Sequence, residues 1–324
     1  MYKELVILAV LLPTACIAAS ERVDLEGLVL SVSDARCAQI FHIVDQLSLW
    51  DVYSHRQYSR WAEDTHLLDQ ADRELLKKHA ELRKKRGWGN GFEQTFLVDD
   101  SIEHAAATGI AAGLLRADEA NAERDILLHF APKLEPLLQE RQAAINAIQK
   151  QLVARRAELA PLVQQLAHFG EIKEPPTVAV FLVSNAEERD GGGGANGGRI
   201  VVEVPLRDPI GVLLHESLHQ LLRPQEPAIK AAAEAAGMDS TLLKEGIAYA
   251  LYPGVTADTE QGDRLVEDLV RMQLRGAPAS DHFLQFNQLA AVIRPLLKAA
   301  LAPNETISTF LPRATAKWRA VTTL

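Results

Sequence analysis

The sequence predicts an α+β protein that is mostly helical. Apolar residues recur at helical spacing through most of residues 34–170 and again after residue 208. Between these stretches lie two short runs rich in β-branched residues, Thr177–Val183 and Ile200–Val204, which are typical of strands. With 324 residues and 48% hydrophobic content, the chain can bury the core of one large domain or of two intimate subdomains.

Composition narrows the functional classes. A charged content of 24% beside 48% hydrophobic residues is ordinary for a soluble globular protein and excludes a disordered chain, a fibre and a multi-span membrane protein. The formal net charge is −9, and no dense stripe of Lys and Arg interrupts this acidic balance. We therefore expect no nucleic-acid partner.

Residues 1–20 predict an export signal. Leu5–Leu12 is an unbroken apolar run of eight residues, which Pro13 ends and small residues follow through Ser20. The run is too short to span a bilayer, which needs about 20 apolar residues. We expect an exported protein, periplasmic or secreted, with a mature chain of about 305 residues. The alternative is a buried N-terminal helix.

Cys16 offers a second way of processing this signal. Leu12–Cys16 resembles a bacterial lipobox, in which the cysteine becomes the lipidated first residue, although Pro13 stands where an aliphatic residue is usual. A lipid at Cys16 would anchor the protein to a membrane. In either case Cys37 is left alone, so we expect no disulfide framework.

Residues 34–170 predict a helical N-terminal region. The expected helices are Asp34–Trp50, Asp69–Arg86, Ser101–Leu115, Asp118–Phe130 and a long one from about Leu134 to Phe169. Pro161 should kink or split the last, because proline has no N–H for the helix ladder. A polar and aromatic patch would suit a ligand contact, but we interpret it as packing at the core edge: Trp50, Asp51, Tyr53, His55, Tyr58 and Trp61.

Residues 171–324 predict a second region with the sheet and further helices. Asp190–Gly198, between the two strands, contains six glycines in nine residues. A phosphate-binding loop would need Gly-Lys-Ser/Thr and a following helix, and both are missing here. We therefore interpret this glycine run as a flexible hairpin connection.

Cap residues set the limits of the helices after the sheet. Asp208 and Pro209 predict the start of a helix that runs to Leu222. A helix over Glu226–Ala236 should end at Gly237. The remaining predicted helices are Ser240–Leu251, capped by Asp239 or Ser240, then Gln261–Leu274, His282–Ala300 and Glu305–Val321.

The helix after the second strand carries an H-E-x-x-H motif, His215-Glu216-Ser217-Leu218-His219. Residues four apart lie on one helix face, about 6 Å apart along the axis, so both imidazoles can converge on one zinc ion. Glu216 lies beside them and can take a proton from water at the metal. The alternative is a helix whose histidines are only packed or solvated.

A catalytic zinc site needs a third protein ligand and an open position for water. The best candidate is Glu245, on the helix over Ser240–Leu251. Glu234 and Asp239 are rival ligands, which we interpret as a surface charge and a helix cap.

These residues resemble the gluzincin zinc metallopeptidases, the thermolysin-like group. In that group a Glu on a later helix, often followed by Gly and Ala, completes the H-E-x-x-H motif, as Glu245-Gly246-Ile247-Ala248 would here. The resemblance implies a zincin-like core, one zinc ion held by His215, His219 and Glu245, and Glu216 as general base. It covers about 40 residues, and the interval before Glu245 is longer than in the thermolysin and aminopeptidase patterns.

Tyrosines provide candidates for stabilising the oxyanion of a tetrahedral intermediate. Tyr249 and Tyr252 share a helix face with Glu245, because they follow it at i+4 and i+7. A phenol at the metal could donate to the oxyanion, and we select Tyr249 as the catalytic candidate. Packing of both rings in the core is the alternative, and His282 is a rival donor.

The sequence thus predicts an exported zinc metallopeptidase that hydrolyses peptide bonds of a peptide or protein substrate, with Glu216 as general base. The resemblance further implies that Ile200–Val204 is an edge strand that pairs with the substrate backbone. Two alternatives stay open: a zinc hydrolase of a non-peptide amide, and a non-catalytic exported zincin-fold binding protein. The intact Glu216 argues against the second, because a structural zinc site does not need it.

Overall fold

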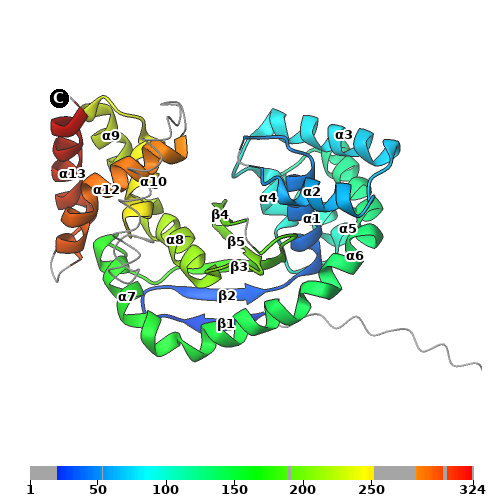
Figure 1. The fold of residues 1–324 in the computed structure, drawn as a ribbon, viewed down its shortest axis with the longest axis horizontal. Helices are drawn as coiled ribbons and strands as arrows, with labels where there is room; N and C mark the ends of the chain where they lie inside the picture. The colour runs from blue at the N-terminus through cyan, green and yellow to red at the C-terminus, as the bar shows by residue number, and fades with distance from the viewer. Residues whose placement is uncertain (1–19, 53, 189–190, 252–281, 302–304, 323–324) are drawn as a thin grey trace, which may run out of the picture.

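The computed structural model describes residues 20–52, 54–188, 191–251, 282–301 and 305–322. Within these residues a small mixed sheet carries helices on both faces, and helices make up most of the structure (Figure 1). This confirms the predicted α+β class. Among the described helices, none is both long and apolar enough to cross a membrane. The predicted export signal with Cys16, Tyr252 and the predicted helix Gln261–Leu274 lie outside the described residues.

The sheet consists of β1 (Glu21–Asp24), β2 (Val29–Ser33), β3 (Thr177–Ser184), β4 (Gly193–Asn196) and β5 (Arg199–Val204). The helices before β3 are α1 (Arg36–Leu47), α2 (Gln57–Asp64), α3 (Gln70–Arg86), α4 (Gly91–Phe96), α5 (Ile102–Ala111), α6 (Ala117–Ala154) and α7 (Arg156–Phe169). After β5 come α8 (Pro209–Leu222), a short 3₁₀ helix (Arg223–Gln225), α9 (Glu226–Ala236), α10 (Ser240–Tyr249), α12 (His282–Ala300) and α13 (Ile307–Thr322).

The strand order is β1-β2-β3-β5-β4. Strands β2, β3 and β5 are parallel, with Val32 opposite Val180 and Val180 opposite Ile200, whereas β1 and β4 pair antiparallel at the two edges. Strands β1 and β2 precede the helical region, in a segment where the sequence analysis assigned no strand. Their patterns of four and five residues are too short to be decisive alone; pairing with β3 stabilises β2, and pairing with β2 stabilises β1.

The glycine run differs from the expected flexible connection. Its residues 193–196 form strand β4, with Gly194 opposite Val201. Gly197 and Gly198 then make a two-residue turn with φ values of 58° and 83°, and such positive values are typical of the hairpin turn that suits strand twist. Strand β5 was expected at the edge but lies inside the sheet, and β4 is the edge strand. Glycines carry little strand signal, so the sequence pattern hid β4.

The sheet separates two hydrophobic cores. Along β3, Val180 and Leu182 face the first core, and Phe181 and Val183 face the second, as the alternation of a strand requires. Helices α7 to α10, α12 and α13 complete the first core, and α1 to α5 complete the second. Helix α6 contributes to both, with Ile145 and Leu152 in the first core. In Figure 1 the yellow-to-red helices and the blue-to-cyan helices accordingly lie on opposite sides of β4.

Helices α6 and α7 divide at a different place from the one predicted. Helix α6 continues through Pro132 and Pro136 to Ala154, and the break falls at Arg155, ahead of Pro161. Burial of α6 residues beside both prolines in the second core outweighs the lost helix hydrogen bonds. Pro161 lies inside α7, so the predicted split does not fall at this proline.

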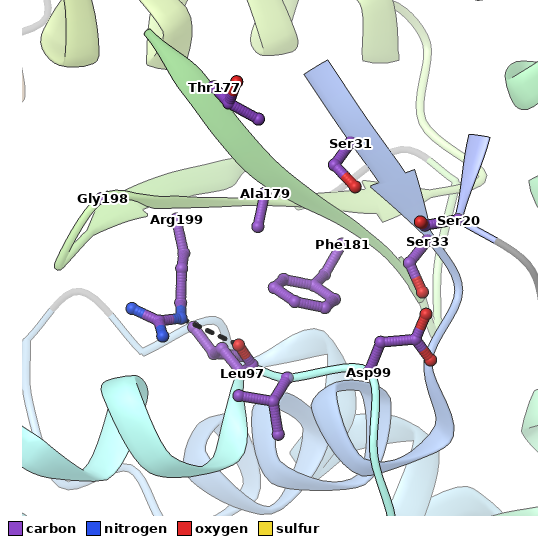
Figure 2. A pocket seen from close by; sticks show the side chains of 11 residues that line it. Ser20, Ser31, Ser33, Leu97, Asp99, Thr177, Ala179, Phe181, Gly198 and Arg199 are labelled. Atoms are coloured by element: carbon purple, nitrogen blue, oxygen red, sulfur yellow. Dashed lines mark hydrogen bonds between the residues drawn. The ribbon is translucent and has the colours of Figure 1, made fainter. Parts of the chain in front are cut away.

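Arg199 ties the start of β5 to the helical N-terminal region. Its Nε donates to the carbonyl of Leu97 at 2.9 Å and its Nη2 to the carbonyl of Gln94 at 3.2 Å. Figure 2 shows this link at the hollow between the sheet and the segment after α4, with Ser31, Ser33 and other polar side chains in its wall. Phe181 lines the same hollow, so the hollow lies on the face of the sheet that packs against the second core.

The predicted solitary thiol and part of the aromatic patch are buried. Cys37 is a free cysteine in α1, and burial raises the pKa of its thiol to about 12, which makes it unreactive. Trp50 and Tyr58 are 5% and 0% exposed, which confirms packing for these two members of the patch. Tyr53 lies outside the described residues.

A buried charge network stabilises the second core. His79 Nε2 lies 2.9 Å from Asp45 Oδ1, and His79 Nδ1 lies 2.9 Å from Glu123 Oε1. Arg83 bonds Asp45 from the next turn of α3 and also pairs with Glu93. Burial would lower the pKa of His79, but the charge of Glu123 and the bond to Asp45 outweigh it and raise the pKa to about 9. His79 is therefore a buried cation at neutral pH.

Replacing His79 should destabilise the fold strongly. We expect His79→Leu to lower the free energy of unfolding by about 3–5 kcal/mol, because it leaves two buried carboxylates short of a partner. Urea unfolding measures this, and His168→Leu, at an exposed position on α7, is the control. A loss below about 1 kcal/mol, as at ordinary surface sites, would contradict the network's importance.

The same network predicts a pH dependence. The folded pKa of His79 is about 9 against an ordinary value of 6.5, so protonation stabilises the folded state. This contribution is fully present below pH 6.5 and is lost as pH rises through about 9. Urea unfolding between pH 6 and pH 10 should show the decline in wild type, and the decline should be weaker in His79→Leu. Equal slopes in the two proteins would refute this assignment.

Candidate metal centre

Helix α8 begins and runs as its sequence predicts. The Asp208 carboxylate accepts from the N–H of Gly211 at 2.9 Å, and Pro209 occupies the first turn. The H-E-x-x-H residues lie in the middle of the helix, whose apolar residues pack on the sheet in the first core. The cap and the packing hold the motif on a rigid element.

His215 and His219 share one face of α8, as the four-residue spacing predicts. Their ring centroids are 5.1 Å apart, and both side chains are about one-tenth exposed. His219 Nδ1 is buried and finds no hydrogen-bond partner among the described residues. Ring packing, and the contact of Nε2 with Glu245, therefore orient this imidazole.

Helix α10 brings Glu245 to the two histidines. Asp239 caps it by accepting from the N–H groups of Thr241 and Leu242 at 2.8 and 3.0 Å. Gly246 allows a close approach to α12, since a Cβ there would lie 2.5 Å from Leu289 Cδ2. Cap and contact together fix the helix that carries Glu245.

The three side chains meet in a geometry that suits a metal ion. Glu245 Oε2 lies 3.4 Å from His219 Nε2 and 3.7 Å from His215 Nε2, and one donor atom from each residue lies within 4.8 Å of the others. Tetrahedral zinc with bonds of about 2.0–2.1 Å separates its ligand atoms by about 3.3–3.4 Å. The spacing and the His₂Glu donor set therefore fit zinc.

The pKa values of the two carboxyl groups at the centre, Glu245 and Glu216, are shifted in opposite directions. Burial would raise the pKa of Glu245, but hydrogen bonds and charge from His215 and His219 outweigh it and hold that pKa well below its usual range. Glu245 is therefore an anion, as a metal ligand must be. Burial raises the pKa of Glu216, against the opposing charge of the two histidines.

Glu216 lies between the two histidines and the edge strand. It is 8% exposed, and a Cβ on Gly193 of β4 would lie 3.4 Å from its Cγ. No local sequence pattern predicts this contact. Two features of the sequence could have indicated strand β4 here: the glycine run beside a strand pattern, and the Asn-Gly-Gly turn at residues 196–198.

Tyr249, the predicted oxyanion donor, lies at the cluster. Its ring centroid is 4.8 Å from that of His215 in an edge-on arrangement, and the ring is partly buried. Its rival His282 is exposed at the start of α12, with its ring 6.3 Å from Phe286. Tyr252 lies outside the described residues.

The two rival ligands have other partners. Glu234 is 67% exposed on α9, within 3.9 Å of Lys230. Asp239 is the cap of α10. The structure thus brings together His215, Glu216, His219, Glu245 and Tyr249, and it leaves Glu234 and Asp239 in the structural roles that the sequence suggested.

Comparisons with protein-family models, with curated proteins and with solved structures find no match to this chain. The geometry of the site is therefore the basis for inferring a function.

Removing any of the three donors should abolish stoichiometric metal binding. We expect the wild type to take up about one zinc per chain. His215→Ala, His219→Ala and Glu245→Ala should each weaken zinc binding by at least about 100-fold, more than the loss of a group that only orients a ligand. Competition with a chelating dye measures the affinity, and His168→Ala on the exposed side of α7 is the control. Wild-type affinity in Glu245→Ala would remove Glu245 as a ligand.

Proposed function

We propose that this protein is a zinc metallopeptidase with a zincin-like core of the gluzincin type. One observation carries the proposal: the donor atoms of His215, His219 and Glu245 lie close enough together to bind one ion, with the buried Glu216 beside them. A bound zinc ion would lower the pKa of a water molecule and polarise the scissile carbonyl. The protein residues supply the remaining chemistry.

Glu216 serves as the general base. Its buried carboxylate follows His215 directly in α8 and lies beside the predicted ion, where it can accept a proton and later release it. It takes a proton from the attacking water and passes it to the leaving amine as the peptide bond breaks. A site with a purely structural metal has no use for this residue, so its place beside the two histidines favours catalysis.

Strand β4 offers a main-chain edge for a peptide. The N–H of Glu203 donates to the carbonyl of Gly192 at 3.0 Å, and Gly194 lies opposite Val201. Because antiparallel ladders alternate, Gly193 and Ala195 direct their N–H and C=O groups away from β5, toward the edge that no described strand covers. A peptide paired there lies beside Glu216, and this edge favours a peptide substrate over another amide.

Tyr249 is placed to donate a hydrogen bond to the oxyanion that forms when water attacks the carbonyl. Its ring contact with His215 sets the phenol at the metal face of α10. Such donors act mainly in the transition state, so they change kcat more than KM.

The N-terminal segment supports a proposal about where in or outside the cell the enzyme acts. We propose an exported enzyme, periplasmic or secreted, on the basis of the signal-like residues 1–20. The lipobox-like Leu12–Cys16 adds the proposal of a membrane-anchored lipoprotein. Mass spectrometry of the mature N-terminus distinguishes an acylated Cys16 from ordinary cleavage.

The decisive test is Glu216→Gln. We expect the variant to bind zinc like the wild type and to lose about 100- to 10,000-fold in kcat on a peptide library, since it lacks the general base. Glu234→Gln, which changes an exposed carboxylate on α9, should leave both properties unchanged. Zinc binding without cleavage in the wild type would refute the peptidase proposal and favour an amide hydrolase or a binding protein.

Tyr249→Phe tests the oxyanion donor. The change removes one hydroxyl and keeps the ring contact with His215, so zinc affinity should stay the same. We expect kcat to fall on the order of 100-fold with little change in KM. Steady-state kinetics on a peptide that the wild type cleaves gives both constants. An unchanged kcat would leave Tyr249 with a packing role only.

A further inference from the structure

Glu203, near the end of β5, is a fully buried carboxylate outside the candidate metal centre. His42 Nε2 lies 2.8 Å from its Oε1. His55 Nδ1, Gln57 Nε2 and the main-chain N of Gly192 lie 3.0, 3.2 and 2.7 Å from its Oε2. A buried carboxylate is costly unless it is hydrogen-bonded in this way, so the four donors form a built site around it.

The donors come from two distant parts of the chain. His42 lies on α1, His55 precedes α2 and Gln57 begins α2, so all three belong to the helical N-terminal region. Gly192 directly precedes the edge strand β4. Burial would raise the pKa of Glu203, but hydrogen bonds from His42 and His55 outweigh it and keep the carboxylate ionised. Each imidazole nitrogen that faces this anion therefore carries a hydrogen.

Gly192 and Glu203 form a hydrogen-bonded pair at the end of the β4–β5 hairpin that lies away from its turn. The main-chain N–H of Glu203 donates to the carbonyl of Gly192 at 3.0 Å, and the N–H of Gly192 donates to the Glu203 carboxylate at 2.7 Å. One main-chain hydrogen bond and one hydrogen bond to the side chain therefore hold this pair together. These two bonds extend the pairing of β4 with β5, which runs from Gly193 opposite Val202 to Asn196 opposite Arg199, by one residue.

Three successive glycines, residues 191–193, connect the surroundings of the Glu203 carboxylate with helix α8. A Cβ on Gly191 would lie 2.6 Å from Glu203 Oε2, and one on Gly192 would lie 3.3 Å from His55 Cε1. A Cβ on Gly193 would point to the other side, 3.4 Å from Glu216 Cγ. The chain is therefore confined on both sides, and a displacement of Gly192 would be passed to the free-edge groups of Gly193.

We propose that Glu203 is a positioning residue for substrate binding. Held by His42 and His55, it fixes Gly192 so that β4 presents its free edge to a peptide backbone at a set place beside α8. The proposal rests on the peptidase function proposed above. It also assigns a task to the helical N-terminal region, which supplies the donors that orient the carboxylate.

Glu203→Gln tests this role, because the amide puts an N–H₂ where a donor now meets an oxygen. Pairing along an edge strand contributes to ground state and transition state alike, so its loss appears in KM. We expect KM to rise about tenfold, kcat to change less than about twofold, and zinc affinity to stay the same. Amide hydrogen exchange should increase in residues 191–197 and stay constant in β3. A general loss of folding would instead raise exchange in β3 and weaken zinc binding.

Matched substitutions of His55 separate the hydrogen bond from packing. His55→Asn keeps an N–H donor near the place of Nδ1, whereas His55→Leu removes it and keeps bulk. We expect a KM and an exchange pattern near wild type for His55→Asn, and values like those of Glu203→Gln for His55→Leu. Equal behaviour of the two variants would overturn the proposal. This pair also decides the matter if Glu203→Gln does not fold, because His55 lies at the rim, with a side chain 32% exposed.

The outcomes also distinguish this inference from the proposed function. If wild type cleaves no peptide while Glu203→Gln increases exchange in residues 191–197, the peptidase proposal fails and Glu203 keeps its role in holding β4. If wild type cleaves peptides while a folded Glu203→Gln has unchanged KM and unchanged exchange, the peptidase proposal survives and the positioning role is refuted.

Discussion

The close contact between edge strand β4 and helix α8 is the constraint on which the candidate site depends. A Cβ on Gly193 would lie 2.7 Å from Val212 Cγ1 and 2.6 Å from the carbonyl of Val201, so only glycine lets the strand lie this close to the helix. The contact puts a free main-chain edge beside Glu216. Among the described residues, this strand is the main-chain edge that lies next to Glu216.

Two layers of structure meet at that contact. The first core, on the α8 side of the sheet, holds His215, His219 and Glu245 in place through capped helices and apolar packing. The second core, on the other side, places His42 and His55 around Glu203. Because β5 has one face in each core, it connects the helical N-terminal region with the metal centre. The two regions therefore share one sheet.

The features that local chemistry decides were predicted well. Asp208 with Pro209 and Asp239 cap their helices as expected, and the four-residue spacing of His215 and His219 puts both rings on one face. Features that depend on distant pairing were missed. Strand β2 depends on pairing with β3, and β1 on pairing with β2. Burial in the second core carried α6 through two prolines, where the sequence predicted an interruption.

By itself, the sequence determined the fold class, the capped helix α8 and the residues able to bind a metal, since caps and helix faces depend on neighbours within a few positions. The sequence favoured Glu245 over Glu234 and Asp239 as the third donor, and the tertiary structure brings it to His215 and His219 from another helix. Only the tertiary structure decided that the glycine run is the edge strand and that Glu203 lies among donors from the N-terminal region. Those contacts join residues that are far apart in the chain, and no local pattern encodes them.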